Sequence, residues 1–509
     1  MTKLLLLIFL AALAVTATPA ELAKKPKLVL VIVIDQFRYD YLTRFRGDYR
    51  GGLDRLLTRG AVFMNAYHEH YPTVTAVGHG VIMTGAAPSV NGIIENDWFD
   101  RDAGKSVTSV LDESVQILGG TGKGASPRRL LVSTVGDELE RATGGKSRVI
   151  GISIKDRAAI LPAGNLADAA FWYDSAEGNF VSSTYYFPDL PAWVKEFNAR
   201  KSAERYQGKG WLDHKLPDNE KIRSAVISSP FGNDLLEAFV ERAIQAENLG
   251  LDDTTDLLTV SFSSDDYVGH TYGPDSPEVR QASKEADRTI DKLFRYLDTR
   301  IGMQNVLVVL TGDHGVAPLP AADDNARNSG GRMASGIIQK AVQQALVQKY
   351  GEGNWILDAG EPALYLNTAL IRQKKLDPNE FEDAVRDAVL TVPHVFRAYT
   401  RHQLIQGDVS RDFVGQRVLN GYNVRRGGDV VYVLEPYWVS ARTGATHGGA
   451  FHYDAHVPVI FMGQGIRPGR YNREIAVFDI APTLAGLLDL ETPSGSYGRV
   501  LPEILPEKR

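Results

Sequence analysis

The sequence predicts an α/β fold in which a largely parallel central sheet is flanked by helices and carries inserted cap segments. Short runs of Val, Ile and Leu, such as L-V-L-V-I-V-I at 28–34, have the continuous apolar character of strands that are buried on both faces. Segments with helical periodicity alternate with these runs, as expected for a parallel sheet covered by helices. The 509 residues, 44% of them hydrophobic, are enough to bury a large core.

The predicted elements follow in chain order. The strands are expected at 28–34, 147–154, 257–263, 306–311, 429–434 and 457–462. Helices are expected at 76–84, 127–142, 231–248, 276–299, 331–349 and 377–390. Ser126-Pro127 and Asp377-Pro378 each combine an N-cap residue with a proline at the first helical position, which is a typical helix start.

Two regions interrupt the alternation, and we predict them to be cap insertions near 160–230 and 350–430. The first has weak periodicity and is rich in aromatic, Gly, Pro and Ser residues, while the second combines helix and short-strand patterns. The prediction is therefore one catalytic domain over 21–509 that carries both insertions.

The first twenty residues have the pattern of a secretory signal peptide. Lys3 precedes an apolar run from Leu4 to Val15, which is short for a membrane span, and small residues follow, with cleavage acceptable after Ala17 or Ala20. An uncleaved N-terminal anchor is the alternative. We expect a periplasmic or secreted protein that has no membrane anchor after cleavage and is a monomer.

Composition excludes several classes of site. The net charge of −6 gives no basic footprint, so no nucleic-acid-binding surface is expected. The chain has no cysteine, which excludes thiolate-held metals and any cysteine-derived catalytic group. A zinc ion would have to be held by oxygen and nitrogen alone, and such sites are more often catalytic than structural.

Six acidic and imidazole side chains can provide ligands for two metal ions. Asp35, Asp266 and Asp313 come shortly after predicted strands, and sites in open α/β sheets lie beyond the carboxyl ends of the strands. Asp266 and His270 are four residues apart, which places both on one face of a helical turn. The two predicted sets are Asp266, His270 and His447, and Asp35, Asp313 and His314. Two metals with open positions could clamp both oxygens of a displacement at phosphorus.

The segment Y-P-T-V-T-A-V-G-H at 71–79 supplies hydroxyl groups for a nucleophile. Thr75 precedes the predicted helix 76–84, where the positive end of the helix dipole and a zinc ion would favour an alkoxide. A helix-capping role for Thr75 is the alternative, and Thr73 is an equally good nucleophile on this argument alone.

The chain resembles the alkaline phosphatase superfamily and, within it, the PafA-type phosphate-irrepressible alkaline phosphatases, which are related to the nucleotide pyrophosphatase/phosphodiesterases. The segments that carry the resemblance span nearly the whole chain after the signal, in family order. They are I-D-Q-F-R at 34–38, Y-P-T-V-T-A-V-G-H-G at 71–80, N-G-I-I-E-N-D-W at 91–98, S-I-K-D-R-A-A at 153–159, S-F-S-S-D-D-Y-V-G-H at 261–270, T-G-D-H-G at 311–315, and T-H-G-G with H-V-P-V-I-F at 446–461.

The resemblance implies that Thr75 is the nucleophile and zinc ligand, and it implies the two ligand sets given above. It also implies that Asn96, Lys155 and Arg157 contact the phosphoryl oxygens. Charge agrees with this role, because two zinc ions balance three aspartates and a threonine alkoxide, so a dianionic monoester needs about two further positive charges. Without the resemblance, Lys155 and Arg157 could equally be a solvated strand end.

We therefore expect a two-zinc phosphate monoesterase that acts on small molecules through a phosphothreonine intermediate. The alternatives are a phosphodiesterase or nucleotide pyrophosphatase on the same scaffold and, from another class, a catalytically silent zinc-stabilised binding protein. Ligand type alone leaves manganese, iron and cobalt open.

Overall fold

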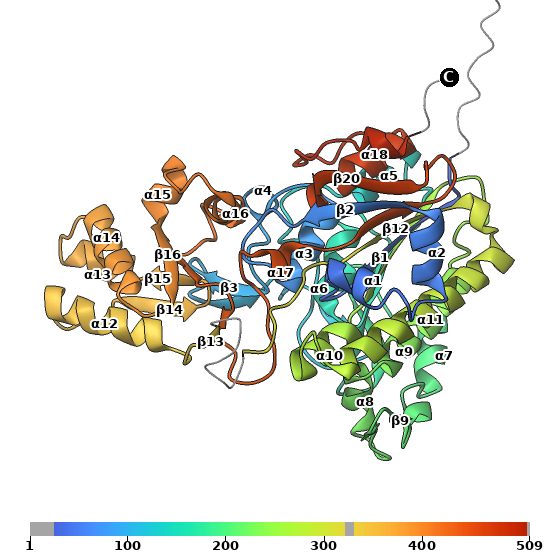
Figure 1. Cartoon of the computed structure of the whole chain (residues 1–509), viewed down its shortest axis with the longest axis horizontal. Helices are drawn as coiled ribbons and strands as arrows, with labels where there is room; N and C mark the ends of the chain where they lie inside the picture. Colours follow the sequence, from blue (N-terminus) through green and yellow to red (C-terminus); the bar gives the residue numbers. More distant parts are fainter. Residues whose placement is uncertain (1–24, 321–329, 506–509) are drawn as a thin grey trace, which may run out of the picture.

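The computed structural model describes residues 25–320 and 330–505, so the predicted signal peptide lies outside the described residues. A ten-stranded sheet runs through the molecule in the order β20-β2-β19-β12-β1-β11-β6-β7-β8-β5 (Figure 1). Its five middle strands are parallel: β12 (Val306–Thr311), β1 (Leu28–Ile34), β11 (Asp256–Phe262), β6 (Val149–Ser153) and β7 (Ala169–Asp174). The predicted α/β class with a largely parallel sheet is confirmed.

Outer strands complete the sheet on both sides and include all its antiparallel pairs. β19 pairs antiparallel with both β12 and β2, while β20 pairs parallel with β2. At the other edge, β8 pairs antiparallel with β7 and with β5. These strands are β19 (Val459–Met462), β2 (Ala61–Tyr67), β20 (Gly469–Ala476), β8 (Asn179–Ser183) and β5 (Ile117–Leu118).

The two faces of β1 explain the uninterrupted apolar sequence of this strand. Leu28, Leu30 and Ile32 belong to one hydrophobic core, and Val29 and Val31 belong to the core on the opposite face. Helices cover both cores (Figure 1). The first core includes side chains from α2 (Gly52–Arg59), α9 (Phe231–Ala246) and α11 (Pro277–Arg300), and the second from α3 (Thr75–Ile82), α5 (Val135–Thr143) and α18 (Ile480–Leu488).

A second sheet, with its own hydrophobic core, lies beside the central one (Figure 1). Its antiparallel strands run in the order β14-β15-β17-β16. The strands are β14 (Ile356–Gly360), β15 (Ala363–Leu366), β17 (Val430–Leu434) and β16 (Val395–Thr400). Its helices include α12 (Ile337–Tyr350), α13 (Thr368–Gln373), α14 (Pro378–Leu390), α15 (Arg401–Gln406) and α16 (Phe413–Gly421). The strand predicted at 429–434 therefore exists, but it belongs to this second sheet.

Some predicted boundaries are wrong. The helix expected from residue 127 begins only at Val135, because Thr134 and Asp137 form a reciprocal capping box there, while the Ser126 hydroxyl is bonded to Asp112 instead. α12 begins at Ile337, six residues later than expected. Within the region 160–230, β7 and β8 extend the central sheet. Only the segment after these two strands lies outside the sheet, and it forms short helices such as α7 (Ala192–Ala199) and α8 (Ile222–Ala225).

No helix among the described residues combines the length and the apolar character that crossing a bilayer would require.

Candidate active site

Three histidines are held in one orientation by the same kind of hydrogen bond. Each donates from its Nδ1 to a main-chain carbonyl oxygen, which can only accept, so the proton is fixed on Nδ1 and Nε2 is left as a free lone pair. The bonds join His270 to Ala445 (2.8 Å), His314 to Gly315 (2.9 Å) and His447 to Thr73 (2.8 Å).

The three free imidazole nitrogens face three aspartates at the carboxyl ends of parallel strands. Asp35 directly follows β1, Asp313 comes two residues after β12, and Asp266 lies in α10 (Ser264–Tyr272), which follows β11. The Nε2 of His270 lies 3.2 Å and that of His447 3.7 Å from Asp266 Oδ1. The Nε2 of His314 lies 3.5 Å from Asp35 Oδ1 and 3.4 Å from Asp313 Oδ2.

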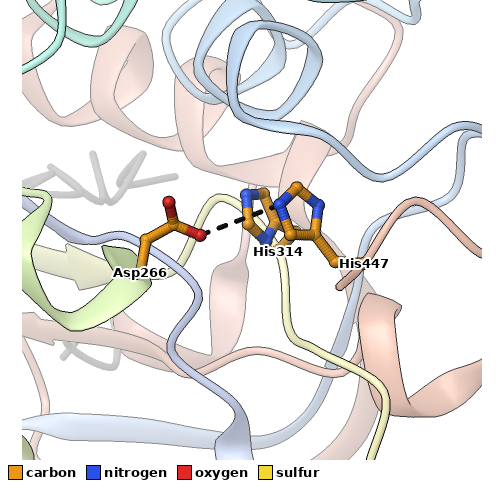
Figure 2. A group of neighbouring side chains, drawn as sticks. All are labelled: Asp266, His314 and His447. Atoms are coloured by element: carbon orange, nitrogen blue, oxygen red, sulfur yellow. Dashed lines mark ion pairs between the residues drawn. The ribbon is translucent and has the colours of Figure 1, made fainter. Parts of the chain in front are cut away.

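These side chains fall into two overlapping groups that could each hold a metal ion. One contains Asp266, His314 and His447 (Figure 2), and the other contains Asp35, Asp313 and His314. His314 therefore stands between the two groups, with its ring stacked 3.6 Å from that of His447. His270, which we predicted as a ligand together with Asp266, belongs to neither group, although its Nε2 lies 3.2 Å from Asp266 Oδ1.

The electrostatics of the cluster fit a bound cation. Asp35 Oδ1 and Asp313 Oδ2 are buried without a hydrogen-bond donor, and the other oxygen of Asp35, also buried, has Lys155 Nζ as its ion-pair partner at 2.7 Å. Burial, and then the charge of Asp313, raise the pKa of Asp35 well above its usual value. Burial alone would also raise the pKa values of Asp266 and Asp313, but Lys155 beside Asp266, and the His314 and His79 imidazoles beside Asp313, outweigh it and hold both pKa values far below normal. Three carboxylates gathered out of water in this way need compensating positive charge.

Thr75 is the first residue of α3 and is buried against this cluster. Its Oγ1 lies 3.4 Å from His314 Nε2 and 3.3 Å from Lys155 Nζ. Gly78 allows the helix to approach, because a Cβ atom there would stand 2.1 Å from the carbonyl oxygen of Asp313. One turn on, His79 bonds the Thr75 carbonyl at 2.8 Å through Nδ1, which also lies 3.2 Å from Asp313 Oδ2.

The other candidate hydroxyl and the neighbouring histidines point elsewhere. Thr73 donates its hydroxyl to the Gly449 carbonyl at 2.8 Å. His68 and His70 are buried and bond each other at 3.0 Å, and His68 Nε2 lies 3.0 Å from the Gly312 carbonyl oxygen. With the bond from His70 Nδ1 to the Pro72 carbonyl oxygen at 2.9 Å, all four ring nitrogens of this pair are engaged, so the two histidines have a structural role.

Two of the three predicted phosphate-binding residues, Asn96 and Lys155, have contacts at the start of α3. The Asn96 side chain accepts from the Ala76 amide at 2.9 Å, so it caps the start of α3. Lys155 Nζ lies 2.7 Å from Asp35 and 2.6 Å from Asp266. Arg157 has a buried Nε without a hydrogen-bond partner. Lys155 and Arg157 do not form the solvated strand end that was the alternative for them, because β6 ends at Ser153, the buried Lys155 is the N-cap of α6 (Asp156–Ala163) and Arg157 lies in its first turn.

Gln36 is a site residue to which the sequence assigned no role. Its Nε2 donates to Asp266 Oδ1 at 2.6 Å, and its main-chain amide donates to Asp313 Oδ1 at 3.1 Å. Its backbone is left-handed (φ 63°), and Gly269 leaves the space for its side chain, since a Cβ atom there would lie 1.8 Å from Gln36 Oε1. The only signal in the sequence was its place in the I-D-Q-F-R segment.

A parallel sheet with carboxylates, imidazoles and a buried hydroxyl beyond its strand ends is an arrangement typical of metal-dependent hydrolases. The family model described as type I phosphodiesterase / nucleotide pyrophosphatase matches residues 29–454. The chain belongs to this family.

Comparison with individual relatives indicates which kind of enzyme within this family the chain is similar to. The chain is 36% identical to alkaline phosphatase PafA of Elizabethkingia meningoseptica, over 94% of this chain and 95% of that protein. It is 37% identical to alkaline phosphatase PhoV of Synechococcus elongatus, over 94% and 93%. The crystal structure of wild-type PafA matches with a TM-score of 0.88 over 95% of this chain and 99% of that one, at 36% identity.

A crystal structure of a PafA variant, in which a threonine, an asparagine, a lysine and an arginine are substituted, matches with a TM-score of 0.90 at 35% identity, over 95% of this chain and 99% of that one. Together these relatives confirm the predicted resemblance to PafA-type alkaline phosphatases and the predicted enzyme class, a phosphoric monoester hydrolase.

Proposed function

We propose that the chain hydrolyses phosphate monoesters at a two-zinc centre, with Thr75 as the nucleophile that becomes phosphorylated. The observation that carries this proposal is the position of the Thr75 hydroxyl. It is buried at the start of α3, within 3.4 Å of a ligand imidazole and 3.3 Å of a lysine ammonium group. A hydroxyl in such surroundings is placed to lose its proton and attack phosphorus.

The ligands proposed for one zinc ion are Asp266, His270 and His447, and those for the other are Asp35, Asp313 and His314. Thr75 is a further proposed zinc ligand, through the same hydroxyl oxygen that acts as the nucleophile. The free Nε2 atoms and the orphaned carboxylate oxygens support these assignments. Zinc bound there would lower the pKa of a hydroxyl or water and stabilise an alcohol as it leaves.

In the first step the Thr75 hydroxyl loses its proton and its oxygen bonds to phosphorus, the bond from phosphorus to the ester oxygen breaks, and that oxygen takes up a proton, so the leaving group departs as the alcohol. Water then attacks the phosphothreonine, which releases phosphate and restores the threonine. Asn96, Lys155 and Arg157 hold the non-bridging oxygens throughout. The orphaned Nε of Arg157 and the closeness of Lys155 Nζ to Thr75 Oγ1 support these roles.

The crystal structure of the substituted PafA variant supports the roles that we propose for Thr75, Asn96, Lys155 and Arg157. Its threonine and asparagine have the same separation in sequence as Thr75 and Asn96, and its lysine and arginine the same separation as Lys155 and Arg157. The corresponding residue types thus recur at corresponding spacing in the relative.

The experiment that tests the proposal compares kcat/KM for an aryl phosphate with that for its aryl methyl phosphodiester, before and after chelation and zinc readdition. We expect faster turnover of the monoester, because two cationic side chains match its two negative charges, and loss of activity on chelation. Preference for the diester would instead support a phosphodiesterase. Turnover of neither ester would support a silent binding protein.

We further propose that residues 1–20 direct export to the periplasm or the medium and that the mature chain is a monomer. The signal-like sequence supports export. Cell fractionation with N-terminal sequencing, and light scattering of the purified protein, test these two statements.

A further inference from the structure

The two chain segments that carry the nucleophile and one of the histidines are bonded to each other. The nucleophile segment, residues 68–74, connects β2 to Thr75, and the His447 segment comprises residues 446–450. His447 Nδ1 donates to the Thr73 carbonyl oxygen at 2.8 Å, and the Thr73 hydroxyl donates back to a carbonyl oxygen of the His447 segment at 2.8 Å. The position of the His447 ring therefore depends on how these two segments lie against each other.

A buried arginine from a helix of the second sheet bonds both segments. Arg417 lies in α16, and only 1% of its surface is exposed. Its Nη1 donates to the Ala450 carbonyl oxygen in the His447 segment at 2.8 Å, and its Nη2 donates to Glu69 Oε1 in the nucleophile segment at 3.0 Å. Because a guanidinium group is planar and its N–H donors have fixed directions, it holds these two acceptors at a set separation.

The main chain of α16 is itself fixed against the nucleophile segment. The Tyr71 amide donates to the Arg417 carbonyl oxygen at 3.0 Å, and the Asn420 side chain donates to the Glu69 carbonyl oxygen at 2.5 Å. Gly421 permits this close approach, since an added Cβ atom would lie 1.6 Å from the Tyr71 carbonyl oxygen. The Arg417 side chain therefore starts from a fixed place, and its guanidinium group can determine where the His447 segment lies.

The burial of Arg417 favours a role in positioning over a role in stability. Its carboxylate partner Glu69 is partly exposed, and its Nε is buried without a hydrogen-bond partner among the described residues. A buried ion pair is often no more stabilising than well-packed apolar side chains in its place. An apolar side chain could not, however, bond the two segments at the same time.

We propose that Arg417 is a positioning residue of the active site, which holds His447 in place relative to Thr75 and thereby strengthens the binding of the zinc ion assigned to His447. Arg417 acts through the main chain of the His447 segment and not by touching the substrate. The second sheet, which contributes none of the proposed ligands, thus supports the catalytic centre through α16. The inference rests on the proposed two-zinc function.

The first test measures zinc affinity by chelator competition. Arg417→Met keeps much of the side-chain volume but removes the donors, whereas Arg417→Lys keeps the charge. We expect Arg417→Met to bind one of the two zinc ions about tenfold or more weakly and the other with unchanged affinity, because the groups that orient a metal ligand contribute to metal affinity. Arg417→Lys should recover part of this loss, and kcat for an aryl phosphate in Arg417→Met should rise at higher zinc concentration.

A control separates positioning from general loss of stability. Val385→Ala removes a fully buried side chain from the core of the second sheet, so it should lower Tm and leave both zinc affinities at the wild-type value. Wild-type zinc affinities in Arg417→Met, or an equal loss in Val385→Ala, would overturn the inference. If Arg417→Met does not fold, Glu69→Gln, which weakens the same bond at its partly exposed end, decides between the same outcomes.

A second measurement does not depend on zinc. Hydrogen exchange of the full chain, with and without chelator, should be about tenfold faster over residues 446–450 in Arg417→Met than in the wild type or Val385→Ala. Unchanged exchange and zinc affinity in an active, zinc-binding enzyme would overturn the positioning role and leave the proposed function intact. Faster exchange in Arg417→Met, together with a wild type that binds no zinc, would instead overturn the two-zinc function and support the positioning of the His447 segment.

Discussion

The three histidines that we propose as metal ligands illustrate what single residues contribute to this site. The sequence nominated His270, His314 and His447 as ligands, but it did not say which ring nitrogen of each faces the aspartates. That choice depends on carbonyl oxygens at Ala445, Gly315 and Thr73, two of them far away in sequence. Contacts of this kind arise only when distant segments meet, so no local pattern reveals them.

Arg157 should distinguish the two ester classes. Replacing it with alanine removes one of the two cationic groups that we assign to the phosphoryl oxygens. We expect kcat/KM for an aryl phosphate to fall about 10- to 100-fold and that for the methyl diester to fall much less, since the diester has one negative charge fewer. Arg148→Ala, at an exposed ion pair with Asp168, is the control. An equal loss for both esters would refute the charge argument.

Gln36 should act through the metal ligands rather than through the substrate. Gln36→Asn preserves a residue type that tolerates the left-handed backbone but draws the amide away from Asp266. We expect zinc affinity, measured by chelator competition, to fall about 10- to 100-fold and activity to recover at higher zinc concentration. Gln343→Asn, which affects an amide in α12 that bonds Gly353, should change neither quantity. Wild-type zinc affinity in Gln36→Asn would contradict the role.

At the level of elements, sequence patterns located α9, α11 and α14 to within two residues, because each carries a clear start signal or a long apolar face. They failed for α5, where Ser126-Pro127 looks like a helix start but the Ser126 hydroxyl bonds Asp112 from another segment. A cap signal predicts a helix only when its side chain is free to cap.

The packing of α3 on the Asp313 loop should be sensitive to a single methyl group. At Gly78 an added Cβ would meet the Asp313 carbonyl oxygen at 2.1 Å, so either the helix or the loop must move. We expect Gly78→Ala to lower the free energy of unfolding by about 1–3 kcal/mol and to reduce kcat sharply, because both Thr75 and Asp313 shift. Thermal unfolding and aryl phosphate kinetics measure these effects. Gly47→Ala, where nothing lies within 4 Å, is the matched control, and a wild-type Tm for Gly78→Ala would contradict the packing argument.

At the scale of the whole molecule, the sequence predicted the parallel core but not how the remaining strands are divided. β7 lies in a region that looked like an insertion, yet it pairs with β6, while the equally apolar β17 joins the second sheet. Strand partners are set by pairing across long sequence separations, whereas apolar character reports only burial.

Metal removal should destabilise the whole molecule as well as inactivate it. Without bound cations, the three buried aspartates of the centre repel one another. Zinc at a hundred times its dissociation constant should add about 2.7 kcal/mol per site to the free energy of unfolding. Calorimetry should therefore show a lower Tm after chelation and its recovery with zinc, and a Tm unaffected by chelation would argue against a metal centre in the folded core.

The most direct test of the central claim is the substitution of Thr75 by alanine, with serine as the conservative variant, followed by aryl phosphate turnover and metal analysis of the same preparations. The account predicts that Thr75→Ala loses activity by at least about a thousandfold with its metal content intact, while Thr75→Ser keeps measurable turnover because a hydroxyl remains. Near-wild-type turnover in Thr75→Ala would contradict the account.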